Sequence, residues 1–362
     1  MLPSSNHPVN MHWTQLPAET LALLRRGTVI PAHLLALDAS RRLDPRRQRA
    51  LTRYYLDAGA GGLAVGVHAT QFAIREAGLY EPVLKLAADE ARTWDKGGVK
   101  RPVLLVAGLS GRTDQASKEA AIATGLGYHA GMLSLAAMKG ATVEQLIAHC
   151  RAIAATIPLV GFYLQPAVGG IHLPVEFWRR FCEIENVIAV KIAPFNRYRT
   201  LDVAKGLVAA RAEERITLYT GNDDHIVLDL LVPLAVKRGN EEIRVRIKGG
   251  LLGHWSVWTK RAAGLLERIR NSTQIDAELL ALDSKVTDAN SAFFDVAHDF
   301  AGCIAGCHEV LRRQGLLEGI WCLDPKEGLS PGQAGEIDRV YAAYPEMNDD
   351  AFVKDNLSRW MT

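Results

Sequence analysis

The stretch Asn186-Val187-Ile188-Ala189-Val190-Lys191-Ile192-Ala193-Pro194 contains a lysine, Lys191, within a run of apolar residues. The apolar residues that surround Lys191 at consecutive positions are typical of a parallel strand buried on both faces. Burial penalises the charged form of an amine, so the pKa of Lys191 is expected to fall until the neutral, nucleophilic amine is populated near neutral pH. The alternative is that Lys191 extends from the strand end into solvent.

The composition of the chain is that of an ordinary globular protein. Of its 362 residues, 48% are hydrophobic and 23% are charged, and the formal net charge is +2. This balance gives no electrostatic reason to expect a nucleic acid or a membrane surface as partner. Residues 1–20 lack the apolar core of a signal peptide, and no apolar run is long enough to span a bilayer, so we expect a cytoplasmic protein.

The cysteines are few and odd in number, which argues against a disulfide framework. Two of them lie beside His308 on an expected helix, but no further ligands follow at the spacing of a metal site. We therefore expect no metal and assign these residues to the core and the surface. The five cysteines are Cys150, Cys182, Cys303, Cys307 and Cys322.

A regular alternation of strand-like and helix-like segments surrounds the opening stretch. Asp44-Pro45 is a typical helix start, and Thr142 with Gln145 forms a capping box. Eight such units predict a (β/α)₈ barrel over residues 27–271, with an N-terminal arm at 1–26 and a C-terminal helical extension at 272–362. The extension is expected to be helical at 276–315 and 332–360. The expected strands are 28–37, 62–67, 102–107, 130–135, 158–163, 187–193, 216–219 and 243–252.

Barrel enzymes place their chemistry at the carboxyl ends of the strands. The expected ends carry His68 after the second strand, Tyr163 on the fifth, Lys191 on the sixth and Asp223 after the seventh. Tyr163 and Lys191 fall on neighbouring strands at the same level, and a phenol beside an amine suits the proton transfers of iminium formation. The alternative for Tyr163 is a half-buried residue with its hydroxyl hydrogen-bonded nearby.

Two motifs resemble those of the dihydrodipicolinate synthase/N-acetylneuraminate lyase family of class I aldolases. The segment 158–166, Pro-Leu-Val-Gly-Phe-Tyr-Leu-Gln-Pro, is similar to the family strand that ends in Tyr-Asn-x-Pro, and the opening stretch is similar to the strand with the Schiff-base lysine. Residues 58–63 and 221–224 add to the likeness, which runs from about Gly27 to the eighth helix. The resemblance implies Lys191 as the Schiff-base lysine, Tyr163 as the general acid/base, and a homotetramer or homodimer.

The chain departs from the family pattern where substrates are recognised. His68-Ala69 stand where the family has paired threonines that bind the substrate carboxylate, and Ala137-Met138 replace a tyrosine pair. Val168 stands where the synthases have an arginine. We interpret His68 as a carboxylate donor or relay, or else as a histidine bonded to a neighbouring loop.

Asp223 and Gly169 have two interpretations each. Asp223 faces the pocket or caps the following helix, and Gly169 with Gly170 admits a close ligand or serves a turn. The substrate-binding residues we predict are His68, Ala69, Val168, Gly169 and Asp223.

The leading hypothesis is a Schiff-base aldolase or lyase that acts on a 2-oxo acid or a carbonyl compound derived from a sugar acid. This chemistry requires no metal and no organic cofactor, because the covalent imine on Lys191 is the electron sink. Lys248-Gly249-Gly250 and Gly253 suggest a phosphate-binding class I aldolase instead. The lost recognition residues suggest a third class, a ligand-binding descendant without turnover. Within the leading hypothesis, we expect that the protein is not itself a dihydrodipicolinate synthase.

Overall fold

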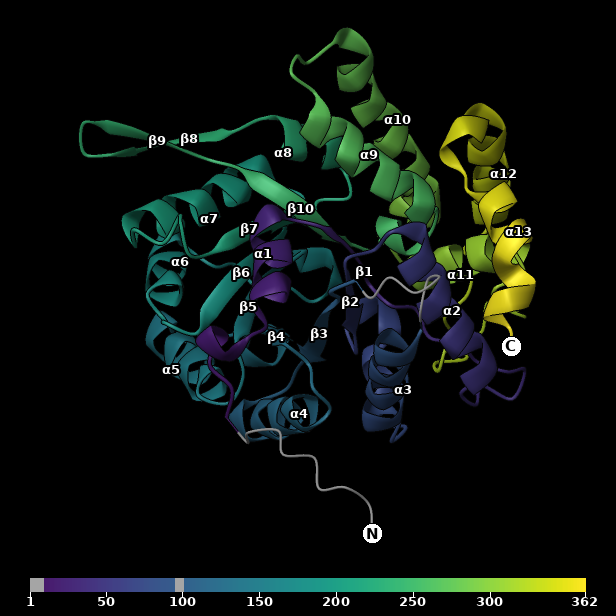
Figure 1. Ribbon diagram of the computed structural model, residues 1–362, viewed down its shortest axis with the longest axis horizontal. Helices are drawn as coiled ribbons and strands as arrows, with labels where there is room; N and C mark the ends of the chain where they lie inside the picture. The colour runs from purple at the N-terminus through teal and green to yellow at the C-terminus, as the bar shows by residue number, and fades with distance from the viewer. Residues whose placement is uncertain (1–9, 95–100) are drawn as a thin grey trace.

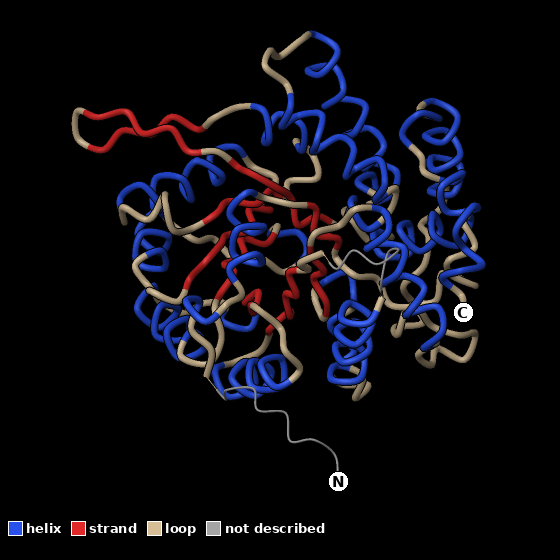
Figure 2. The backbone as a smooth tube through the Cα atoms, in the orientation of Figure 1, coloured by secondary structure: helices blue, strands red, loops and turns tan. Residues whose placement is uncertain are grey.

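The strand that carries Lys191, β6 (Val187–Ala193), lies within an eight-stranded parallel sheet that curls into a barrel (Figures 1 and 2). The computed structural model describes residues 10–94 and 101–362. The strand order is β1-β10-β7-β6-β5-β4-β3-β2, and a parallel bridge between Ala32 and Ala64 joins the two edges. The other strands are β1 (Val29–Pro31), β2 (Gly62–Val65), β3 (Leu104–Leu109), β4 (Ala130–Leu133), β5 (Leu159–Leu164), β7 (Thr217–Thr220) and β10 (Ile247–Leu252).

Helices surround the barrel, and their ends follow from local sequence. Asp44 accepts a hydrogen bond from the backbone of Arg47 at the start of α2, and Gly59 ends that helix in the left-handed conformation. The expected capping box of Thr142 and Gln145 is present at the start of α5. The helices of the ring are α2 (Pro45–Ala58), α3 (Tyr80–Thr93), α4 (Thr113–Gly125), α5 (Val143–Ala154), α6 (Val175–Cys182), α7 (Arg197–Ala209), α8 (Ile226–Leu231) and α9 (Thr259–Asn271).

Two apolar layers give each strand two different faces. One layer fills the barrel interior and includes Phe162 and Leu164 of β5. The other lies between the strands and the helices and includes Val190 and Ile192 of β6. Because side chains alternate along a strand, consecutive residues enter different layers. The expected burial of β6 on both faces is confirmed, since all seven of its residues are buried.

The N-terminal segment covers the amino ends of the strands. Helix α1 (Ala18–Arg26) lies across that end of the barrel (Figure 1), and the Tyr219 hydroxyl donates to the carbonyl oxygen of Leu24 at 2.8 Å. The Asn186 side chain accepts a hydrogen bond from the backbone of Trp13 at 2.8 Å and donates one to the Met11 carbonyl oxygen at 3.0 Å. This end is therefore closed by protein, and the carboxyl ends of the strands face the other side. The part of the expected arm at residues 1–9 lies outside the described residues.

After α9 the chain continues into four further helices on one side of the barrel (Figure 1). The regions 276–315 and 332–360 are helical as expected, with breaks between residues 293 and 303 and between residues 343 and 350. The first break faces the carboxyl ends of the strands. Among residues 10–94 and 101–362, no helix has the length and apolar character that crossing a membrane requires. The four helices are α10 (Ala277–Phe293), α11 (Cys303–Arg313), α12 (Gln333–Ala343) and α13 (Asp350–Trp360).

An antiparallel hairpin of β8 (Leu234–Arg238) and β9 (Glu241–Val245) precedes the eighth barrel strand and projects from the molecule (Figures 1 and 2). The expected eighth strand, 243–252, merged part of this hairpin with β10. The sequence marks this turn, because Gly239-Asn240 is a typical two-residue hairpin loop and Gly239 has a φ of +61°.

Candidate active site

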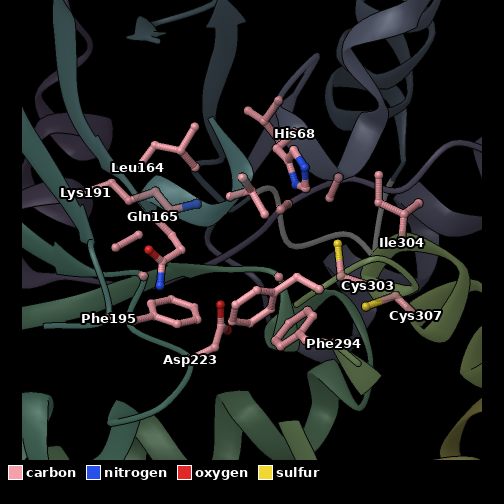
Figure 3. A pocket seen from close by; sticks show the side chains of 18 of the residues that line it. His68, Leu164, Gln165, Lys191, Phe195, Asp223, Phe294, Cys303, Ile304 and Cys307 are labelled. Carbon is pink, nitrogen blue, oxygen red and sulfur yellow. The ribbon is translucent and has the colours of Figure 1, made fainter. Parts of the chain in front are cut away.

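Lys191 lies near the carboxyl end of β6 and points into a cavity at the mouth of the barrel (Figure 3). Its side chain is 9% exposed, and its amine lies 4.6 Å from the centre of the Phe162 ring. Gly221 lets the side chain pass, since a Cβ there would lie 2.6 Å from the Lys191 Cε. The cavity, rather than bulk solvent, receives the amine.

Asp223 supplies the carboxyl group that influences Lys191 most directly. It lies after β7 and lines the same cavity, and its Oδ1 accepts a hydrogen bond from the backbone of His254 at 3.2 Å. Burial lowers the pKa of Lys191 to about 8, against the attraction of Asp223, and burial raises the pKa of Asp223 to about 7, against the attraction of Lys191. A neutral amine and a protonated carboxyl group are therefore both accessible near neutral pH.

The neighbouring helix α8 does not use Asp223 as a cap. His225 occupies the cap position, without a capping hydrogen bond from its side chain. The interpretation of Asp223 as a residue that faces the pocket is thus the one that agrees with the structure.

His68 lies on the far side of the cavity from Asp223 (Figure 3). Burial, with a smaller contribution from the Lys191 charge, lowers the pKa of His68 to about 4, so the ring is neutral at pH 7. Within the described ranges its ring nitrogens have no hydrogen-bond partner, and its ring packs against Phe72 with centroids 5.7 Å apart. The neutral ring is available to a ligand as a donor or an acceptor.

Two further residues of the predicted binding set, Ala69 and Val168, also line the cavity. Gly169 does not line it. It is exposed, has a φ of +96° and ends the short turn after β5, so the interpretation as a turn residue agrees with the structure. Thr70 is no substitute for the missing family threonines, because its hydroxyl donates to the His33 carbonyl oxygen at 2.6 Å.

Tyr163 is not where the sequence analysis expected it. It lies on the strand next to β6, but the residue in register with Lys191 is Phe162, and Tyr163 is paired with Ile192. Its side chain therefore enters the outer layer, where its ring packs against Trp178 and its hydroxyl accepts a hydrogen bond from the backbone of Leu173 at 3.3 Å. The expectation that the Tyr163 phenol lies beside the Lys191 amine is wrong. Side chains alternate between the two faces of a strand, and the two groups lie on opposite faces of the sheet.

We expect the substitution Tyr163→Phe to leave imine formation and turnover within a few-fold of the unmodified protein. The loss of one buried hydrogen bond should lower the free energy of unfolding by roughly 1 kcal/mol. Trapping kinetics and a denaturant melt of the same preparation measure both effects. A fall in rate of about 100-fold or more, the usual scale for a lost general acid or base, would restore Tyr163 to the mechanism.

Sequence reasoning missed the wall of the cavity that the C-terminal extension provides. Residues of this wall come from the end of α10, from the following loop and from the first turns of α11. Figure 3 shows Cys303, Ile304 and Cys307 across the cavity from Lys191. The cysteines assigned to core and surface belong to this group. The wall consists of Phe294, Phe300, Cys303, Ile304 and Cys307.

The phosphate-binding alternative rests on Lys248, Gly249, Gly250 and Gly253. Gly249 and Gly250 are packed within β10, where a Cβ would lie 2.6 Å from the Thr28 backbone or 2.5 Å from the Trp255 ring. Lys248 lines a different cavity with Arg26 and Arg270, and of these four residues Gly253 alone lines the Lys191 cavity, so together they form no phosphate cradle beside Lys191. Across residues 10–94 and 101–362, no three histidine, cysteine, aspartate or glutamate side chains are grouped to hold a metal ion.

Comparison with known proteins agrees with this architecture. The model of the dihydrodipicolinate synthetase family matches residues 25–233. An N-acetylneuraminate lyase of Citrobacter koseri is 26% identical over 207 residues, which cover 56% of this chain and 65% of that enzyme. The chain thus spans about two-thirds of the length of this curated relative.

Solved structures of the same kind share the fold. A chloride-inhibited dihydrodipicolinate synthase of Acinetobacter baumannii, complexed with pyruvate, has a TM-score of 0.70 at 17% identity, over 87% of this chain and 98% of that one. An N-acetylneuraminate lyase of Fusobacterium nucleatum has a TM-score of 0.69 at 17% identity, over 88% and 99% of the two chains.

Proposed function

Because this chain belongs to the dihydrodipicolinate synthetase family, we propose that it is a class I aldolase or lyase that forms a Schiff base on Lys191. The substrate is a small carbonyl compound, either a 2-oxo acid or one derived from a sugar acid. The observation that carries the proposal is the buried Lys191 amine, with its lowered pKa, beside Asp223 in a cavity at the carboxyl ends of the strands.

Asp223 takes the role that sequence analysis gave to Tyr163. The lone pair of the neutral Lys191 amine forms a bond to the carbonyl carbon, and the carbonyl oxygen receives protons and leaves as water. The carboxyl group of Asp223 supplies the one proton that the amine does not, which leaves a carboxylate beside the positive iminium. The pair therefore has the same net charge before and after the reaction, a favourable arrangement in a buried site. The iminium then withdraws electrons from the adjacent carbon, where a bond is cleaved or formed.

The 2-oxo acid part of the proposal is supported by the relative from Acinetobacter baumannii, which was solved with pyruvate. The test is reductive trapping with borohydride against a panel of 2-oxo acids, read by intact mass and by peptide mapping. A mass increase that maps to Lys191 supports the proposal. No adduct with any member of the panel, in protein that is folded by its melting curve, would contradict it.

We expect negligible dihydrodipicolinate synthase activity. Val168 offers no charge to the carboxylate of a second substrate, and an aliphatic side chain cannot imitate a bidentate arginine. Ala137 lines a separate cavity with Ser110 and Gln115, so its segment brings no hydroxyl to Lys191. Purified protein given pyruvate and aspartate semialdehyde should form the cyclic product far more slowly than about 1 per second, and turnover at that rate or faster would contradict the expectation.

A ligand-binding protein without turnover is the second candidate, because the predicted acid/base Tyr163 faces away from the cavity. The trapping experiment separates the two. A ligand that raises the melting temperature but leaves no adduct on Lys191, and is released unchanged, would favour the second candidate.

We further propose that the protein forms a homo-oligomer, either a tetramer or a dimer. The family resemblance is the main support, and the projecting hairpin of β8 and β9 and the C-terminal helices offer surfaces that could modify the interfaces. Light scattering is expected to give a mass that is a multiple of the 39.6 kDa chain. A single mass near 39.6 kDa over a wide concentration range would contradict this.

A further inference from the structure

The cavity around Lys191 is apolar over most of its wall. The barrel contributes aliphatic and aromatic side chains, and the C-terminal extension contributes two phenylalanines and an isoleucine. Apart from Lys191, the polar side chains of the lining are few: His68, Gln165, Asp223, Cys303 and Cys307. Burial raises the pKa of Cys303 to about 12 and raises that of Cys307 well above its usual value, so both thiols are neutral and are weak hydrogen-bonding groups.

Aromatic rings line the cavity from both the barrel and the extension. Phe162 lies beneath the Lys191 amine, and Phe195 and Phe300 meet edge to face with centroids 5.8 Å apart. Phe195 has a φ of +51° and Phe300 a φ of +69°. A bulky residue in the left-handed region is strained, and such strain is found where the surroundings require one side-chain position. The backbone here is held in an unfavourable conformation that presents two rings to the cavity.

The anchors of this loop are polar and buried. The Asp295 carboxylate, 3% exposed, accepts hydrogen bonds from the Gly302 backbone at 2.9 Å and from the Ser330 hydroxyl at 2.5 Å. These bonds tie the loop that carries Phe300 to the body of the extension. The aromatic wall is therefore a fixed part of the site rather than a loosely attached loop.

A polyhydroxylated substrate has few partners in this cavity. Asp223 serves the reacting carbonyl, and His68 is the residue interpreted as a donor to the substrate carboxylate. Apart from the two thiols, this leaves Gln165 as the further polar side chain of the described lining, and its amide oxygen already accepts a hydrogen bond from the Ala167 backbone at 3.4 Å. Hydroxyl groups buried against phenylalanine and isoleucine would lose their hydrogen bonds to water without replacement. An apolar group loses no hydrogen bonds when it is buried there, and a planar ring in particular gains contact with the phenylalanine rings.

We infer that the carbonyl compound that reacts with Lys191 bears an apolar, ring-containing group, which binds between the barrel and the wall supplied by Phe294, Phe300 and Ile304. This inference rests on the proposed Schiff-base function and names its substrate class. It excludes the extended hydroxylated chain of a sugar acid as the preferred substrate.

The test compares phenylpyruvate with a polyhydroxylated 2-oxo acid of equal charge, with pyruvate as the reference. Trapping on Lys191 should reach half-saturation at a concentration of phenylpyruvate at least about tenfold lower than for the hydroxylated compound. In parallel, calorimetry compares 3-phenylpropionate with gluconate, neither of which has a carbonyl group to form an imine. Preference for the ring in calorimetry without any adduct would reject the Schiff-base function and keep the apolar site. Equal or stronger binding of the hydroxylated partner in either assay would overturn the inference.

Two variants locate the ring. Ile304→Asn should raise the half-saturating concentration of phenylpyruvate about tenfold more than it raises that of pyruvate. Leu280→Asn is the matched control, since Leu280 lies on α10, is 45% exposed and does not line the cavity. Phe294→Leu keeps the wall apolar, and it provides a second measurement if Ile304→Asn does not fold. Equal responses of both wall variants and the control would contradict the assignment of the wall.

Discussion

Replacement of Lys191 by arginine is expected to abolish reductive trapping altogether. A guanidinium remains protonated at every accessible pH, so it has no lone pair to offer a carbonyl carbon. Intact mass after treatment with a 2-oxo acid and borohydride should show no addition. Lys248→Arg is the matched control, because Lys248 lines a different cavity and its replacement should leave the adduct unchanged.

The arginine variant should also fold, because Asp223 remains beside the introduced charge. A permanent cation at this position would lower the pKa of Asp223, so the pair would be ionised at neutral pH. A melting curve close to that of the unmodified protein would show that the loss of labelling is chemical. An adduct that survives in Lys191→Arg, or that maps to another lysine, would remove Lys191 from the mechanism.

Replacement of Asp223 by asparagine should lower turnover by roughly two to four orders of magnitude, the range for a lost general acid. The amide keeps the shape of the side chain and an oxygen that can accept from the His254 backbone. Asp224→Asn is the matched control, since Asp224 is exposed and its carboxyl group interacts mainly with Arg197 rather than Lys191. Equal rates for both variants would show that Asp223 does not transfer the proton.

The pH profile gives a second, independent measurement of the pair. Below about pH 7 Lys191 and Asp223 are both protonated, and an ammonium cannot attack a carbonyl carbon. Above about pH 8 both are deprotonated, so no acid remains to assist the loss of water. The rate should therefore be highest between these values. In Asp223→Asn the fall at high pH should disappear, and the remaining rate should rise once with pH as Lys191 loses its proton. An unchanged bell-shaped profile in this variant would contradict the assignment.

The barrel was readable from the sequence because local signals and periodicity agree along most of the chain. The run of apolar residues in 187–193 predicted β6 with its correct bounds, and Asp44-Pro45 predicted the start of α2. The position of Lys191 at a strand end follows from the same pattern. These features depend on neighbours in sequence, which a single chain displays.

The rest of the site depends on geometry that the sequence does not display. The level of Tyr163 along the barrel could be predicted. The face of the sheet on which its side chain lies depends on the register between β5 and β6, which pairs Phe162 with Lys191. The wall could not be predicted because it follows a break after α10 at which Asp295, Asp299 and Phe300 all have positive φ values. None of the three is glycine, so no local signal marks this turn.

Part of the wall of the Lys191 cavity lies on α11, and this has a consequence for the stage of folding at which the cavity is completed. A protein is made from its amino end, and domains fold as the chain emerges. Lys191 leaves the ribosome long before Cys303 and Ile304, which help to close its cavity. Before α11 docks the cavity lacks one wall, so the amine is less buried and the lowering of its pKa by burial is smaller. The reactivity of Lys191 therefore depends on a segment that lies more than a hundred residues after it in the chain, as well as on the barrel strand that carries it.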